Sequence, residues 1–102
     1  MGTKRIKHPA SIMQTERECF ICKRTQPLHK HHIYGGGARL LSEQHGFWVL
    51  LCPDHHTGDH GVHNDEYANL WLKRTCQATY EATHSHEEFM HIIGKNYMEV
   101  KL

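Results

Sequence analysis

The chain of 102 residues contains no run of 18 apolar residues, and no apolar stretch follows its basic N-terminal residues. We therefore expect neither a membrane-spanning helix nor a secretory signal peptide. Without an export signal, the four cysteines are expected to be reduced thiols or metal ligands rather than disulfides.

The chain has few apolar side chains, and its net charge is small. Hydrophobic residues make up 38% of the chain and the mean hydropathy is −0.67, so a single domain of this length has a thin core. Small domains with thin cores often need a metal or a disulfide to stabilise them. The net charge of +1, with the histidines neutral, excludes a strongly basic protein. Any contact with nucleic acid must then come from local patches, or from metal and histidine charge.

The first 17 residues are polar and begin with basic side chains. They predict a flexible basic arm over 1–17, ahead of a single domain over 18–102. Charge runs of this kind are usually solvated, so a loose terminus is favoured over an arm that touches phosphates through Lys4, Arg5 and Lys7.

Two short strands are predicted in the first half of the domain. The stretch "LHKHHIY" alternates and ends in β-branched and aromatic residues, and "FWVLLC" is a continuous apolar run typical of a buried strand. They are expected to pair as a hairpin across "GGGARLLSEQHG", whose three consecutive glycines favour a loop. In "PDHHTG", Pro53 at a good first helical position and Gly58 soon after predict one or two helical turns.

Two more helices are predicted in the C-terminal part, residues 64–102. Asn64 can cap a long amphipathic helix over 65–82. Ser85 and Glu88 form a capping box for a short last helix, which Gly94 ends. The apolar face expected for the long helix carries Tyr67, Leu70, Trp71 and Ala78.

Two knuckles, Cys19-x-x-Cys22 and Cys52-x-x-His55, are separated by 29 residues. Thiolates and imidazole at this spacing can grip a tetrahedral ion, and three cysteines with one histidine leave no position open for water. The pattern predicts a structural zinc ion that joins the N-terminal segment to the end of the second strand. A redox pair or ordinary buried cysteines are the alternatives, but "TERECFICKRTQ" lacks the apolar strand that precedes a redox motif. Cys76 is expected to be a small core residue.

A second group of histidines raises the question of a reactive site. His55 and His56 point about 100° apart on a helix, so they should serve different sites. Beside His56, an ion could be held by His31 and by a third histidine further on, which leaves positions open as in catalytic sites. The alternative is that these are surface histidines or isolated core histidines, but so many histidines within a short stretch make this less favoured. The five histidines within 33 residues are His31, His32, His56, His60 and His63.

The segments "HKHHIY", the glycine-rich loop, "FWVLLCPDHH" and the further downstream histidine together resemble the HNH endonuclease family. They are most similar to the small HNH proteins of phages and prophages that carry a pair of zinc knuckles. The similarity is strong over roughly 19–63, and "EEFMHIIGKNYM" adds a weaker signal. It implies an α+β fold with a ββα-metal core over 19–63, followed by the long helix and the short C-terminal helix.

The resemblance also implies roles for single residues. His31 would bind the catalytic ion and His32 would be the general base. In bacteriocin nucleases of this type the next ligand lies 24 residues after the base, at His56, and the last one four residues later, at His60. The phage-type pattern Gly-Val-His instead points to His63. Two glycines interrupt the helix that the four-residue spacing needs, so His63 is preferred and His60 is its rival.

One position departs from the family's pattern. The asparagine that braces the hairpin loop through backbone hydrogen bonds falls on Phe47, whose side chain cannot form them. The bracing is therefore expected from Ser42 or Glu43.

The activity implied is metal-assisted hydrolysis of DNA phosphodiester bonds, giving a 5′ phosphate and a 3′ hydroxyl. His32 would deprotonate the attacking water, and an ion at the three other histidines would bind the scissile phosphate. Besides structural Zn²⁺, this site would take Mn²⁺, Ni²⁺ or Zn²⁺, and Mg²⁺ less readily.

DNA is the expected partner, through its phosphate backbone, with no membrane contact. The expected location is cytoplasmic, in the host cell if a phage encodes the chain. Arg39 is a candidate phosphate clamp, with a solvated loop arginine as an equal alternative. Lys73 and Arg74 are expected on the solvated side of the long helix, and His29 is interpreted as peripheral. Further contacts to the backbone are expected from Lys23, Arg24 and Lys30.

Two other functions compete with a nuclease. A non-catalytic zinc-ribbon-like module that binds nucleic acid or protein explains the two knuckles but not the second histidine group. A histidine-rich metal-handling protein would bind more than two ions and would have no affinity for nucleic acid.

Overall fold

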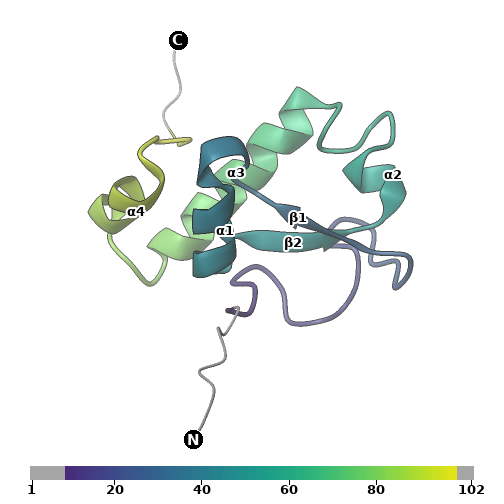
Figure 1. Cartoon of the computed structure of the whole chain (residues 1–102), viewed down its shortest axis with the longest axis horizontal. Coiled ribbons are helices and arrows are strands. Elements are labelled where there is room, and N and C mark those ends of the chain that lie inside the picture. The colour runs from purple at the N-terminus through teal and green to yellow at the C-terminus, as the bar shows by residue number, and fades with distance from the viewer. Residues whose placement is uncertain (1–8, 99–102) are drawn as a thin grey trace, which may run out of the picture.

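The structure, a computed structural model, describes residues 9–98 (Figure 1). Strands β1 (His29–His32) and β2 (Trp48–Leu51) form a two-stranded sheet. Four α-helices accompany it: α1 (Arg39–His45), α2 (Pro53–His56), α3 (Glu66–Glu81) and α4 (His86–Ile93). The predicted α+β class is confirmed. Among the described residues, no helix has the length and apolar character needed to cross a membrane.

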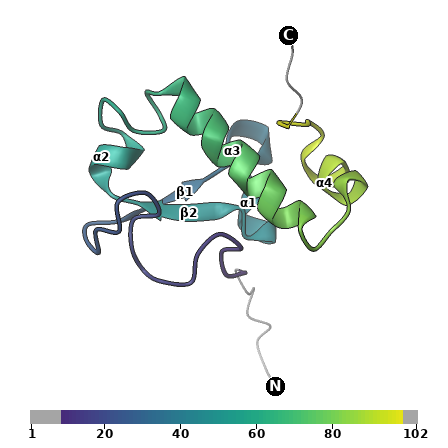
Figure 2. The same ribbon diagram turned by 180° about the vertical axis from the view of Figure 1, so that it is seen from behind.

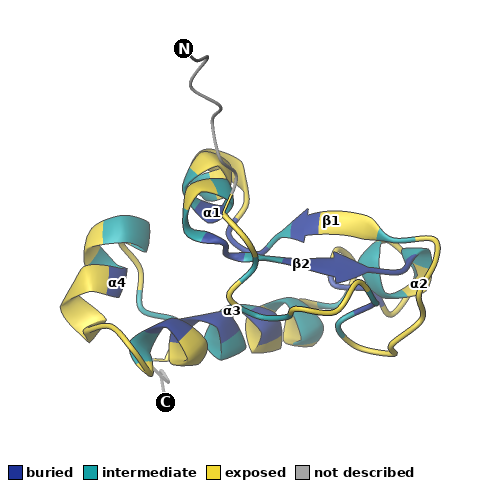
Figure 3. Cartoon of the chain, turned by 90° about the horizontal axis from the view of Figure 1, so that it is seen from below, coloured by how far each residue is buried: buried dark blue, intermediate teal, exposed yellow. Residues whose placement is uncertain are grey.

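The sheet is the antiparallel hairpin that the sequence predicts, with His29 opposite Leu51 and His32 opposite Trp48. Its two strands differ in burial, and α3 runs along one side of the sheet (Figures 2 and 3). β2 is buried from Val49 to Leu51, while β1 buries only His31. The α2 end and the α1 end lie at opposite ends of the hairpin.

The connection between the strands is more regular than its glycines suggest. It contains a 3₁₀ turn, η1 (Gly36–Ala38), and then helix α1, so the expectation of a loop is wrong for its second half. Arg39, expected on that loop, is the first residue of α1. The helix ends at Gly46, whose φ of 73° suits glycine and whose N–H bonds to Ser42 O.

Residues 9–17 contain no helix or strand, but part of this segment is tied to β2. The Ser11 hydroxyl donates to Trp48 O at 2.5 Å, and Gln14 Oε1 accepts from Leu50 N at 2.7 Å. Such long-range bonds satisfy backbone groups at the outer edge of β2. The rest of the predicted arm, residues 1–8, lies outside the described residues.

The long helix and the last helix form where predicted, but α3 differs in its cap and its buried face. Asp65, not Asn64, is the N-cap, and its side chain accepts from Tyr67 N and Ala68 N. Tyr67 is 88% exposed and Trp71 49% exposed, so the predicted apolar face is wrong. The face that is buried lies on the other side of the helix and carries Leu72, Cys76, Gln77 and Tyr80.

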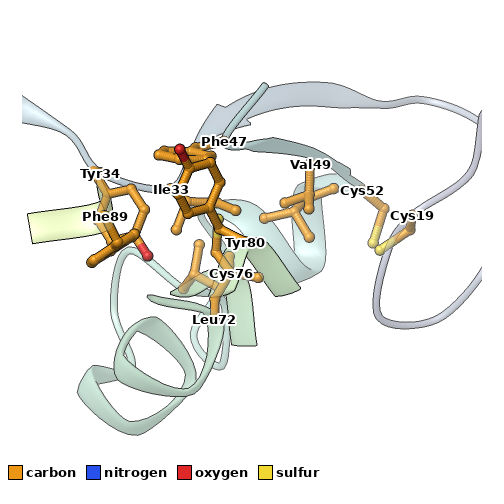
Figure 4. Close-up of a cluster of buried hydrophobic side chains, with 12 residues drawn as sticks. Cys19, Ile33, Tyr34, Phe47, Val49, Cys52, Leu72, Cys76, Tyr80 and Phe89 are labelled. Atoms are coloured by element: carbon orange, nitrogen blue, oxygen red, sulfur yellow. The ribbon is translucent and has the colours of Figure 1, made fainter. Parts of the chain in front are cut away.

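Helix α3 offers two stripes of apolar side chains, and contact with the sheet selects one of them. The selected stripe meets an aromatic cluster, in which Phe47 lies 5.4 Å from Tyr80 and 5.6 Å from Tyr34 between ring centroids (Figure 4). Phe89 brings α4 to the same cluster, 5.7 Å from Tyr34. Cys76 is fully buried there, as the sequence predicts for a small core residue.

The loop that carries α1 is braced by Ser42, one of the two residues expected to do so. Its hydroxyl accepts from Tyr34 N at 3.1 Å and donates to Tyr34 O at 2.7 Å, and its carbonyl accepts from Phe47 N at 2.8 Å. Ser42 is fully buried, so no water can replace its hydroxyl as the hydrogen-bond partner of these backbone groups.

We expect Ser42→Ala to lower the free energy of unfolding by about 1–3 kcal/mol, because it leaves a buried N–H and a buried C=O of Tyr34 unpaired. Urea denaturation followed by Trp fluorescence measures this. Thr79→Ala is the matched control: it also removes a hydroxyl bonded to a backbone carbonyl, but at an exposed position of α3. Equal losses in the two variants would contradict the bracing role.

Candidate functional site

The site is organised around helix α2, which begins just after β2. Cys52 is its N-cap, Pro53 is its first residue, and the N–H groups of His55 and His56 both bond to Cys52 O. Two clusters of side chains with metal-ligating atoms within 4.8 Å of one another lie on its two sides among the described residues. One contains Cys19, Cys22, Cys52 and His55, and the other contains His31, His56 and His63.

The first cluster has the geometry of a closed metal site. The Sγ atoms of Cys22 and Cys52 are 3.7 Å apart, and His55 Nδ1 lies 3.8 Å from Cys19 Sγ and 3.3 Å from Cys52 Sγ. Metal–sulfur bonds of about 2.3 Å and metal–nitrogen bonds of about 2.1 Å place tetrahedral ligands about 3.4–3.8 Å apart. The four residues could therefore hold a metal ion such as zinc, and they would fill all four coordination positions of a tetrahedral ion.

The chain around Cys19 is shaped for this role. Cys19 N bonds to Arg24 O at 2.7 Å, Lys23 N bonds to Cys19 O at 2.9 Å, and Lys23 has a positive φ of 70°. Burial would raise the pKa of the Cys19 thiol, but backbone N–H groups, first that of Cys22, lower it to about 6. A thiolate is the form that binds metal. The sulfur atoms of Cys19 and Cys52 face each other at one end of the core (Figure 4).

Removing one ligand tests this cluster. We expect native mass spectrometry to count one zinc ion in the wild type and none in Cys22→Ala. The melting temperature of Cys22→Ala should also fall, because metal binding stabilises only the folded chain. Cys76→Ala is the control, since it deletes a buried thiol outside the cluster and should keep one zinc. Retention of zinc by Cys22→Ala at wild-type affinity would contradict the assignment.

The second cluster joins three elements. His31 comes from β1, His56 from α2, and His63 from the turn before α3. The ring centroids of His56 and His63 are 4.6 Å apart, and each ring lies 5.2–5.3 Å from that of His31. His56 Nε2 and His63 Nε2 are 3.0 Å apart, close to the roughly 3.0–3.4 Å that separates two nitrogen ligands of one ion.

Two of these histidines are held in the neutral form that ligates metals. Burial first, then the nearby rings of His56 and His63, lower the pKa of His31 to about 4. Burial, followed by His63 and His29, also lowers the pKa of His56. At neutral pH both rings therefore present a lone pair.

The turn after α2 decides which downstream histidine joins the cluster. Val62 N bonds to His55 O and His63 N bonds to His56 O, so the chain folds back over the short helix. Val62 is 1% exposed and anchors the turn in the core. His63 thereby meets His56, whereas its rival His60 is exposed and outside the cluster.

His32 lies beside this cluster and is fixed by Glu43, the second residue expected to brace the hairpin. Its Nε2 is 2.7 Å from Glu43 Oε1, and both side chains are mostly buried. Lys30, two residues earlier on the strand, contacts the same carboxylate at 2.8 Å. His29, interpreted as peripheral, instead contacts His56, with 3.1 Å between their Nδ1 atoms.

A cavity of about 540 Å³ exposes the second cluster together with His32. Arg39 lines it, as a phosphate clamp would. Lys23 and Arg24 lie elsewhere, paired with Glu18 at 3.4 Å and Asp54 at 3.2 Å.

Four further residues of this cavity come from the C-terminal part, and none of them was placed at the site from the sequence. They are Asn69, Lys73, Ile93 and Tyr97. Lys73 is half-buried in the cavity and not on a solvated face. The position of Lys73 on the same stripe of α3 as Leu72 and Cys76 was the sequence signal that could have placed it on the inner side of the helix.

Comparison of the chain with models of known protein families, with curated proteins and with solved structures gives no match. The function must therefore be inferred from the two clusters and the cavity.

Gly61→Ala should weaken the second cluster. A Cβ at this position would lie 2.8 Å from the backbone C and O of His56, so the turn must shift and move His63 away. We expect at least ~10-fold weaker binding of a second equivalent of Ni²⁺ by calorimetry. Gly37→Ala, where a Cβ meets nothing within 4 Å, is the control. Identical nickel affinity in the two variants would contradict the role of the turn.

Proposed function

We propose that the protein is a metal-dependent endonuclease of the HNH type that hydrolyses DNA phosphodiester bonds. One observation carries the proposal: His32, held by Glu43 at 2.7 Å, shares a cavity with a three-histidine cluster. A base and an open metal site within reach of one phosphate are the parts that metal-assisted hydrolysis needs.

Glu43 sets the role of each His32 nitrogen. When Nε2 carries the proton and donates it to the carboxylate, Nδ1 is left with a lone pair that can take a proton from water. The carboxylate then stabilises the imidazolium that forms, as an acidic partner does for a histidine base in other hydrolases. Arg39, at the start of α1 and on the cavity wall, would bind a phosphate oxygen with its guanidinium group.

The three histidines of the second cluster would hold the catalytic ion. An ion held by these histidines would supply Lewis-acid chemistry to a phosphate bound in the cavity. Ring nitrogens 3.0 Å apart fit neighbouring ligand positions, and nitrogen donors favour zinc, nickel or manganese over magnesium. Three protein ligands leave positions for water and phosphate, unlike the closed Cys₃His cluster.

A zinc-ribbon-like binding module remains the competing function. It accounts for the Cys₃His cluster but gives no reason for a histidine–glutamate pair beside three clustered imidazoles in a cavity. The nuclease accounts for both clusters.

His32→Ala should abolish cleavage while leaving the fold and zinc content intact. We expect a loss of about 10²–10⁴-fold in the rate of plasmid nicking or linearisation, because general-base catalysis contributes that much. Chelator-stripped proteins would be resupplied with zinc for the closed cluster and then with Mg²⁺, Mn²⁺, Zn²⁺ or Ni²⁺ singly.

His60→Ala is the matched control, since it removes an exposed histidine outside the cluster. It should cut like the wild type. The nuclease proposal fails if the zinc-loaded wild type cuts with none of these ions, or if His32→Ala cuts as fast as the wild type.

A further inference from the structure

The cavity at the histidines continues into a second hollow along α3. The second hollow, of about 1120 Å³, shares four lining residues with the first. The two hollows therefore adjoin, and we refer to them together as the groove, which extends from the three-histidine cluster to the segment after α4. The shared residues are His63, Asn69, Lys73 and Tyr97.

Two lysines in this groove have no acidic partner within residues 9–98. Lys73 Nζ lies 5.4 Å from the centre of the Tyr97 ring, and Lys95 Nζ lies 5.1 Å from it. Among the described residues neither ammonium group pairs with a carboxylate, whereas Lys23, Arg24 and Lys30 all do. Burial first and then Lys95 lower the pKa of Lys73, so the two positive charges repel each other.

The segment that carries Lys95 and Tyr97 is fixed to α3 through its backbone. Gln77, fully buried, accepts from Tyr97 N at 2.8 Å and donates to Asn96 Oδ1 at 2.8 Å. Arg74 Nε donates to Tyr97 O at 2.8 Å. These bonds fix the segment against α3 without involving the side chains of Lys73, Lys95 and Tyr97, so less order has to be imposed on the segment when a ligand binds.

We propose that Lys73 and Lys95, both next to the Tyr97 ring, form a phosphate-binding subsite for the DNA strand next to the scissile phosphate. A phosphate group bound by both ammonium groups would offset their mutual repulsion, and the tyrosine ring offers a flat surface for the adjoining sugar or base. The subsite rests on the proposed nuclease function and extends it. It assigns substrate binding to the helices that follow the metal clusters, whose role the two clusters leave unexplained.

The test uses the full chain with its zinc, in a His32→Ala background that keeps the DNA intact. Binding of a short fluorescein-labelled duplex is followed by anisotropy over a range of salt concentrations. Lys73→Gln/Lys95→Gln should bind at least ~10-fold more weakly at low salt, and its salt slope should fall by about 1, because the subsite neutralises one phosphate. Circular dichroism and zinc content should match the parent protein.

Arg17→Gln is the matched control for each single lysine substitution, because it removes one positive charge from an exposed position outside the groove. Its salt slope should stay that of the parent. Lys73→Arg/Lys95→Arg should restore binding, and Tyr97→Phe should retain it better than Tyr97→Ala.

Kinetics separate a substrate-binding role from a structural one. With His32 present, Lys73→Gln/Lys95→Gln should raise KM about 10-fold and change kcat less than about 3-fold, since the lysines act away from the reacting bond. If the lysine variant binds DNA with the affinity and salt slope of the matched control, the subsite is overturned, and cleavage by the wild type leaves the nuclease standing. If the wild type binds DNA through the lysines but never cleaves it, the subsite stands and the nuclease fails. Absence of DNA binding by the wild type overturns both.

Discussion

The one constraint on which the rest depends is the start of α2 at Cys52. This residue contributes a thiol to the first cluster, and its carbonyl accepts the N–H groups of both His55 and His56. Adjacent residues on a helical turn point about 100° apart, so one histidine faces the cysteines and the other faces β1. A metal ion bound by the Cys₃His cluster would thus fix the direction of His56 as well as join the N-terminal segment to β2.

The residues of the proposed reactive site are supported from a second direction by α1. Ser42 ties the start of the hairpin connection to its end, and Glu43, one residue later, reaches His32. The brace between the two strands comes from α1, through Ser42, and not from Phe47. Phe47 instead lies in the aromatic core, where it contacts Tyr80. In this account α1 connects the core, the hairpin and the proposed general base.

The parts of the molecule that local chemistry determines could be predicted from the sequence. They include the knuckle residues, both strands, the Pro53 start of α2 and the Ser85 cap of α4. The three consecutive glycines before α1 favour a loop, so the helix was not predicted. The buried face of α3 depends on which of its two apolar stripes meets the sheet. The same packing of α3 places Lys73 in the cavity, and the fold of the turn after α2 places His63 there. Such choices depend on tertiary packing, which periodicity alone does not contain.

Cobalt titration of the metal-free protein tests the central claim most directly, that His55 and His56 serve two different metal sites. The first equivalent should give thiolate charge-transfer bands with the d–d spectrum of a tetrahedral ion, and the second should add bands without thiolate character. His55→Ala should alter only the first spectrum, and His56→Ala should remove only the second. A single equivalent bound by the wild type, or the loss of both spectra in His56→Ala, would contradict the division into two sites.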